Sequence, residues 1–149
     1  MIAAVRLFDS GPLRFLPRFI REPRRAWLAI PVAAALTLSG SILLAWLAAN
    51  FAPALAQPEF PMRGLTALAM LVLFAPLAET LIMAGVLSLL VRFLSLTPAV
   101  IASASLWGIA HSLQAPVWGL VIWWPFLIFS TLYVTWRGQG RTIDRKSVV

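Results

Sequence analysis

The chain has 149 residues, of which 61% are apolar and 11% are charged, and its formal net charge is +7. Residues 26–58 and 93–136 contain no Asp, Glu, Lys or Arg, and such stretches exceed what a soluble core of this size can bury. We therefore expect an all-helical, multi-pass integral membrane protein. The absence of cysteine excludes disulfides, zinc–thiolate sites and a cysteine nucleophile.

Residues 1–25 form a basic segment before the first long apolar stretch. Four of its apolar residues recur at helical spacing among arginines, a pattern typical of an interfacial helix with lipid-facing apolar residues and snorkelling arginines. These four are Leu13, Leu16, Phe19 and Ile20. Three prolines limit the regularity of the segment, so a solvated basic tail is the equal alternative.

About four transmembrane helices are predicted within residues 26–136, each near the ~20 residues needed to cross the hydrocarbon. They cover residues 26–50, 64–91, 97–114 and 117–136. Pro116 favours a tight turn between the last two. Trp123 and Trp124 fall in the middle of the fourth span, away from the interface that indole rings prefer. At least one of them is therefore expected to face other helices.

The cations are distributed unevenly around these spans. Eleven lie on one side, and Arg63 lies alone on the other. The eleven are Arg6, Arg14, Arg18, Arg21, Arg24, Arg25, Arg92, Arg137, Arg141, Arg145 and Lys146. The positive-inside rule predicts an inner (plasma) membrane protein with both termini cytoplasmic. Arginines that flank spans meet lipid head groups, so we expect the lipid bilayer as partner and no nucleic acid.

Two features bear on the ends of the mature chain. Ala54 and Ala56 form an A-x-A pattern, which allows a signal peptide cleaved after Ala56. The first span is longer than the ~7–15 apolar residues of a signal peptide, which favours a retained helix. Within the predicted cytoplasmic tail, 137–149, the last nine residues hold the only lysine, Lys146. We interpret these nine residues as non-native, with a natural C-terminal portion missing.

Glu79 is a lone carboxylate in the second predicted span, with fifteen uncharged residues before it and twelve after it. An ionised acid at the bilayer centre costs at least ~2.5–3.5 kcal/mol on insertion scales. Residues that carry this penalty usually face a bundle interior and mark a functional site. Glu79 is therefore the first candidate site residue.

His111 lies at a similar depth in the third predicted span. Measured from the short loop at 92–96, Glu79 is about 18 Å deep and His111 about 21 Å deep, at ~1.5 Å per residue. A stripe of small residues would let the third helix approach a neighbour closely. The stripe consists of Ala104, Gly108 and Ser112. Trp107 and His111 form the adjacent stripe, so we expect the imidazole to reach the carboxylate.

A carboxylate beside an imidazole in a dry cavity predicts a catalytic dyad. Glu79 would take a proton from water as general base, and His111 would polarise that water or stabilise the oxyanion. In a metal variant, both side chains ligate a divalent ion such as zinc, one ligand fewer than the three of a catalytic zinc site. Two alternatives stay open: a hydrogen-bonded pair that only joins two helices, and a proton relay in a small transporter.

The residues around Glu79 and His111 resemble motifs of a known family. PLAETLIMAG, at 76–85, is similar to the first motif, P-x-x-E-E-x-x-x-R, of the CPBP (CAAX protease and bacteriocin-processing, Abi-type) intramembrane proteases. WGIAH, at 107–111, is similar to their second motif, F-x-x-x-H, with Trp for Phe. Residues 126–140 resemble the third block, an apolar helix that ends in a tyrosine and basic residues.

The resemblance implies an endopeptidase that hydrolyses membrane-embedded or lipid-modified substrates, such as prenylated peptides, with Glu79 activating water and His111 as its partner. Thr80 replaces the second glutamate of the family pattern, and Ala84 stands where the arginine is expected. The last family motif, H-x-x-x-N, does not occur in the sequence. We therefore expect weak or no activity from these 149 residues. A catalytically inactive scaffold of the same family is the leading alternative.

Overall fold

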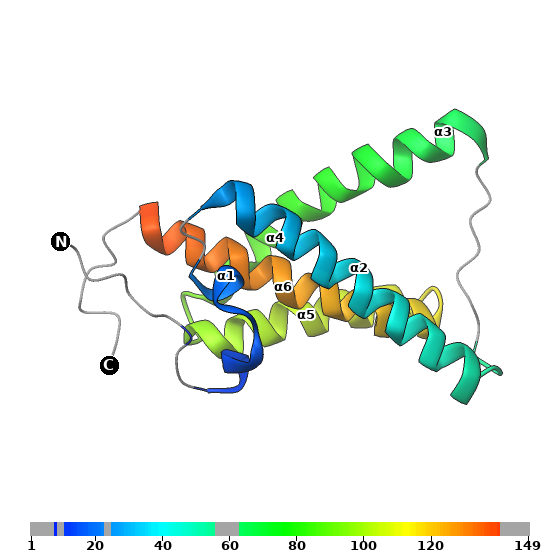
Figure 1. The fold of residues 1–149 in the computed structure, drawn as a ribbon, viewed down its shortest axis with the longest axis horizontal. Helices are drawn as coiled ribbons and strands as arrows, with labels where there is room; N and C mark the ends of the chain where they lie inside the picture. The colour runs from blue at the N-terminus through cyan, green and yellow to red at the C-terminus, as the bar shows by residue number, and fades with distance from the viewer. Residues whose placement is uncertain (1–7, 9–10, 23–24, 56–62, 141–149) are drawn as a thin grey trace.

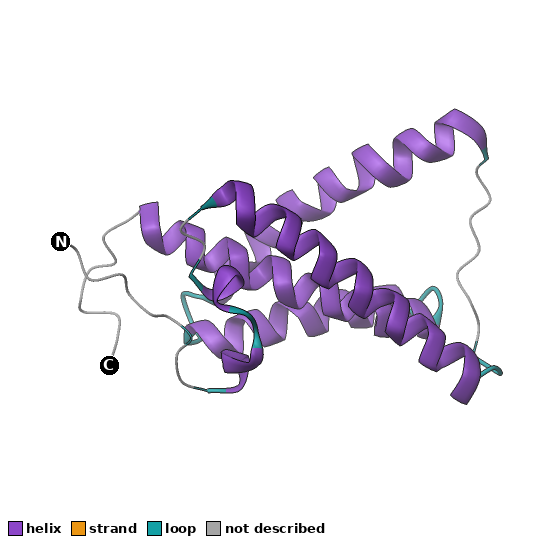
Figure 2. Ribbon diagram, viewed as in Figure 1, coloured by secondary structure: helices purple, strands orange, loops and turns teal. Residues whose placement is uncertain are grey.

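The computed structural model describes residues 8, 11–22, 25–55 and 63–140, which form helices joined by short turns (Figures 1 and 2). In chain order the elements are the 3₁₀ helix η1 (Pro12–Phe15), α1 (Arg18–Arg21), α2 (Ala26–Phe51), α3 (Gly64–Ala69), the π-helix η2 (Met70–Phe74), α4 (Ala75–Leu90), α5 (Leu96–Ser112) and α6 (Pro116–Gly140). The predicted all-helical class is confirmed for the described residues. Ala56 and residues 141–149, which carry the predictions on cleavage and on the tail, lie outside them.

Three helical stretches in the described part of the chain are long and apolar enough to cross a membrane. They are Trp27–Phe51, Gly64–Leu90 and Pro116–Gly138. The predicted third span corresponds to α5, which has 17 residues. At ~1.5 Å per residue α5 extends about 25 Å, short of the ~30 Å hydrocarbon core. The structure thus has three candidate spans, and a crossing by α5 stays a prediction.

The closest packing in the molecule is between α5 and α6, where two backbones touch. A Cβ added at Gly119 would overlap the Gly108 carbonyl oxygen and the Ser112 hydroxyl. A Cβ added at Gly108 would lie 3.2 Å from the Gly119 carbonyl oxygen. The small-residue stripe of α5 therefore packs against α6, because small residues let membrane helices approach closely.

Polar side chains also join α5 to α6. The buried Ser130 hydroxyl donates to the buried Ser103 hydroxyl at 3.1 Å, and the Trp123 indole donates to the Ser105 hydroxyl at 3.3 Å. Trp124, the second mid-span tryptophan, donates to the Leu36 carbonyl of α2 at 2.8 Å. Both tryptophans thus face other helices, as predicted for at least one of them.

The crossing of α2 and α6 compensates for a proline in α6. Pro125 has no N–H, so the Val121 carbonyl lacks its partner within the helix. The Ser41 hydroxyl of α2 donates to this carbonyl at 3.2 Å. Gly40 lies beside Ser41 and leaves room for the Trp124 indole, which a Cβ at Gly40 would overlap.

The helical stretch Gly64–Leu90 packs against the other helices along only one of its halves. The π-helix η2 interrupts it just before Pro76, and proline both removes an N–H and clashes with the turn that precedes it. Before this point, α3 diverges from the other helices (Figure 1). After it, α4 approaches α5 and α6 and buries Met83 and Leu87. Within this span, therefore, the half that ends at Leu90 packs against the other helices.

The described part of the basic N-terminal segment folds back onto α2 and α6. Leu13, Leu16 and Ile20 are buried in the same apolar cluster as residues of the long helices, and α1 contacts both α2 and α6. Phe15 and Phe19 stay exposed. Within the described residues the segment thus forms two short helices, η1 and α1, and three of its four patterned apolar residues face protein instead of lipid. An interfacial position of the whole segment stays a prediction.

Candidate functional site

The structure brings Glu79 and His111 together. Nε2 of His111 lies 3.6 Å from Oε1 of Glu79. The two helices that carry them, α4 and α5, are joined by the short turn at 91–95, so equal distance along each helix places the side chains at equal depth. The predicted proximity of the two side chains is confirmed.

The imidazole of His111 is oriented by its own helix. Nδ1 lies 2.9 Å from the carbonyl oxygen of Trp107, one turn earlier in α5. A carbonyl oxygen only accepts hydrogen bonds, so Nδ1 must carry a proton. This contact fixes the tautomer and turns Nε2 toward Glu79.

This orientation determines which atoms of the pair can share a proton. With Nδ1 as donor to the Trp107 carbonyl, Nε2 is the ring nitrogen that faces the carboxylate. One proton can then be carried either on Nε2 of His111 or on the Glu79 carboxyl group.

Three aromatic rings enclose His111. Their centroids lie 5.8 Å away for Trp107, 4.8 Å for Trp118 and 6.2 Å for Phe126. His111 has 8% of its side chain exposed, against 32% for Glu79. The histidine is thus shielded, and the carboxylate is the accessible member.

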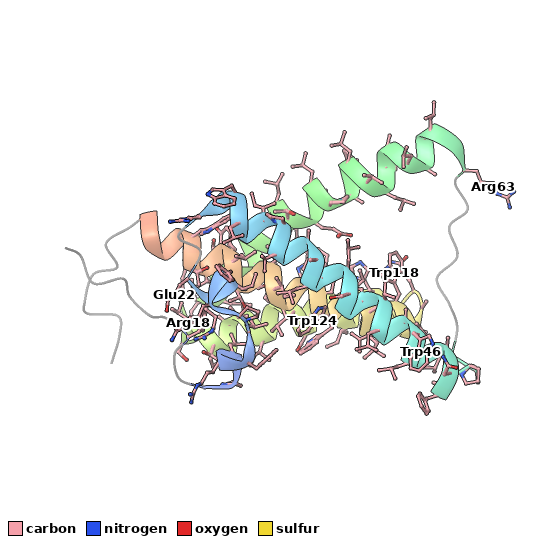
Figure 3. The ribbon with its side chains drawn as sticks, in the orientation of Figure 1. Arg18, Glu22, Trp46, Arg63, Trp118 and Trp124 are labelled. Atoms are coloured by element: carbon pink, nitrogen blue, oxygen red, sulfur yellow. The ribbon has the colours of Figure 1, made fainter. Side chains whose placement is uncertain are left out.

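The contribution of Trp118 to this enclosure was not predicted. Trp118 lies in the first turn of α6, on the side of the molecule where Trp46 and Arg63 are also found (Figure 3). A signal was present, however. His111 and Trp118 are nearly equidistant from the turn at 113–115, so a tight antiparallel hairpin must bring them side by side.

The two departures from the family pattern do not extend the site. The Thr80 hydroxyl donates to the Pro76 carbonyl at 2.6 Å, within its own helix, and the residue is exposed. Ala84 has no polar side-chain atom to offer. The described part of the site therefore consists of one carboxylate and one imidazole.

A metal ion would find few ligands here. No group of three or more His, Cys, Asp or Glu side chains occurs among the described residues. Glu79 and His111 are two ligands, and catalytic zinc sites use three protein ligands. The described donor set does not fit a catalytic zinc ion.

Comparison with known proteins gives no assignment for the site. No protein-family model matches the chain, and no curated protein and no solved structure matches it. The resemblance to the CPBP proteases therefore rests on the sequence motifs that contain Glu79 and His111.

Proposed function

We propose that the protein is a membrane-embedded endopeptidase of the CPBP type, in which Glu79 and His111 activate water. The contact of 3.6 Å between Nε2 of His111 and Oε1 of Glu79 is the observation that carries this proposal. In the imidazolium state of the pair, the carboxylate is a base and Nε2–H is a donor. One pair thus supplies both groups that hydrolysis of an amide requires.

The reaction follows from these two roles. Glu79 accepts a proton from a bound water as the hydroxide adds to the substrate carbonyl carbon. His111, through Nε2–H, stabilises the negative charge that develops on the carbonyl oxygen. The carbon–nitrogen bond then breaks, and the proton passes from Glu79 to the leaving amine. Because the described part of the site offers one such donor, and loss of one oxyanion donor costs ~10²–10³ in kcat elsewhere, we expect slow turnover.

The substrate class follows from the surroundings of Glu79. The carboxylate is partly accessible, and the residues one turn before and after it on α4, Pro76 and Ile82, are exposed and apolar. A water-soluble peptide would gain little on such a surface, whereas a membrane-embedded or prenylated peptide would be partitioned there by its apolar part. We propose substrates of the second kind.

The proposed location is the inner (plasma) membrane, with both termini cytoplasmic. The described arginines support it, because Arg18 lies at one end of the bundle and Arg63 at the other (Figure 3). Alkaline phosphatase fused after Gly138 should be inactive, and the same enzyme fused after Leu55 should be active. The opposite pattern of activity would overturn the proposed orientation.

The peptidase proposal is tested in proteoliposomes with transmembrane and prenylated reporter peptides, and the products are identified by mass spectrometry. Glu79→Gln should reduce cleavage by at least ~10²-fold, since it removes the base but keeps the shape. Thr80→Ala is the matched control and should cleave at the parent rate. If Glu79→Gln cleaves as fast as the parent, the proposal is wrong. If the folded parent cleaves none of the reporters, the inactive scaffold takes its place.

A second candidate function is proton transfer, which the proximity of the carboxyl group and the imidazole favours. A pair that holds one proton between two helices can pass it on, as acidic and histidine residues do in membrane proton relays. Proteoliposomes with an internal pH dye would show proton flux that depends on Glu79. Flux without cleavage supports the relay, and cleavage without flux supports the peptidase.

A further inference from the structure

A cluster of three polar side chains joins α4 to α6 near the ends of both helices, away from the Glu79–His111 pair. The Tyr133 hydroxyl lies 3.1 Å from the Ser88 hydroxyl. Nη1 of Arg137 donates to the Ser88 hydroxyl and, at 3.3 Å, to the Tyr133 hydroxyl. Ser88 in turn donates to the Ala84 carbonyl at 2.6 Å.

These contacts fix how the arginine is oriented. Ser88 has one hydroxyl proton, and the Ala84 carbonyl takes it, so Tyr133 must be the donor in its contact with Ser88. Both Nη1 protons of Arg137 are then used inside the cluster. The guanidinium group has five N–H donors in a fixed fork, so Nη2 and Nε keep three. The cluster thus holds one edge of the guanidinium, and the other edge has no hydrogen-bond partner among the described residues.

The charge of Arg137 is not compensated within the described part of the chain. Its partners there are two hydroxyl groups and the Tyr133 ring, 6.0 Å from the guanidinium carbon, and no described carboxylate pairs with it. The side chain is exposed. Pro116–Gly138, the apolar stretch of α6, ends one residue later, and the neighbouring Trp136 is 37% exposed. Arg137 therefore lies where phosphate groups of a bilayer are expected.

We propose that Ser88, Tyr133 and Arg137 form a binding site for the phosphodiester group of an anionic phospholipid. The free Nε and Nη2 edge of Arg137 takes two phosphate oxygens, the bidentate geometry for which arginine is suited. The hydroxyls of Ser88 and Tyr133 hold that edge in place before the lipid arrives. An arginine that only balances the dipole of the last helical turn would need neither hydroxyl.

The test measures lipid binding to the detergent-solubilised chain by native mass spectrometry. The probes are dioleoyl phosphatidylglycerol and dioleoyl phosphatidylcholine. The parent should prefer the anionic lipid about fivefold, and Arg137→Gln should remove that preference. Arg92→Gln is the matched control. Arg92 is also exposed, follows α4 in the adjoining turn, and has no side-chain hydrogen bond to described residues.

Tyr133→Phe and Ser88→Ala distinguish the contribution of the two hydroxyl groups to lipid binding from that of the Arg137 charge. Both keep Arg137 but remove the hydroxyls that hold it, so the preference should fall about twofold or more, and circular dichroism checks that each variant is folded. Inorganic phosphate, added as a competitor, tests whether the site binds free phosphate instead of a lipid phosphodiester. The lipid proposal is overturned if phosphate alone displaces the bound lipid, if Arg92→Gln acts as strongly as Arg137→Gln, or if the parent shows no preference. Peptide cleavage plays no part in the readout, so the result is independent of the proposed peptidase.

Discussion

The hairpin of α5 and α6 and the span Gly64–Leu90 are both apolar but packed in opposite ways. In the hairpin, backbones touch at Gly108 and Gly119, and half of the most apolar window of α6 is buried. In the span Gly64–Leu90, 11% of the corresponding window is buried. Hydropathy alone does not predict which region packs against protein, because lipid and protein are equally apolar neighbours.

The candidate site takes one residue from each of these two regions. His111 belongs to the tightly packed hairpin and is held by the Trp107 carbonyl and three rings, whereas Glu79 belongs to the loosely packed span. The position of the carboxylate therefore depends on the few contacts that α4 makes through Met83 and Leu87. The comparison predicts that the same kind of substitution has different effects in the two regions.

The largest effect is expected at the touching backbones. Gly119→Ala should destabilise the protein by about 2–3 kcal/mol or prevent folding, because the new Cβ meets a backbone carbonyl that cannot move aside easily. Gly85→Ala is the control in the loose span, where nothing lies within 4 Å of an added Cβ. It should not destabilise. Thermal unfolding followed by circular dichroism in one detergent measures both, and equal melting temperatures would remove the basis of the comparison.

Within the loose span, burial separates two leucines of α4. Leu87 is 0% exposed and Leu81 is 66% exposed. Leu87→Ala should cost about 1–2 kcal/mol from lost packing, below the ~2–5 kcal/mol of an aqueous core, because lipid replaces some of the lost contacts. Leu81→Ala should be close to neutral in the same unfolding assay. A larger loss from Leu81→Ala would mean that the exposed face has a protein partner.

A smaller effect is expected where α2 supports α6. Ser41→Ala leaves the Val121 carbonyl without a donor and should cost about 1 kcal/mol. Ser39→Ala is the matched control, because that exposed hydroxyl bonds only within α2, to Leu36. It should shift the unfolding midpoint much less. Equal shifts from the two variants would show that the carbonyl finds another partner.

The smallest effect is the coupling across the site. A double-mutant cycle of Glu79→Gln and His111→Asn should give an interaction of about 0.6 kcal/mol, and at most ~1.7 kcal/mol, as for other polar pairs between membrane helices. Glu79→Gln combined with Ser39→Ala should instead be additive within ~0.3–0.5 kcal/mol. A cycle without coupling would show that the 3.6 Å contact does not stabilise the fold.

The sequence was sufficient for the helices and for the central pair, for a simple reason. Apolar length sets the spans, so the predicted 26–50 and α2 (Ala26–Phe51) agree within a residue. When two helices are joined by a short turn, the depth of a residue depends only on its number of residues from that turn. Counting residues from the turn therefore placed Glu79 and His111 at the same depth. Neither step requires knowledge of which helix faces turn toward each other.

Other features depend on that knowledge and were missed. The apolar periodicity of Leu13, Leu16 and Ile20 fits a lipid surface and a protein surface equally, so burial against α2 and α6 was not predictable from it. The neighbour of the small-residue stripe could not be identified for the same reason. The π-helix η2 arises from Pro76 in a span that looks regular by hydropathy.

The π-helix also determines how the protein adapts to its bilayer. Gly64–Leu90 has 27 residues and spans about 40 Å at ~1.5 Å per residue, more than the ~30 Å hydrocarbon core, so the surplus must be absorbed by tilting or bending. Because α3 diverges from the bundle beyond η2, the outer half can lean without carrying Glu79 with it (Figure 1). We expect the carboxylate to keep its place beside His111 in thin and thick membranes alike.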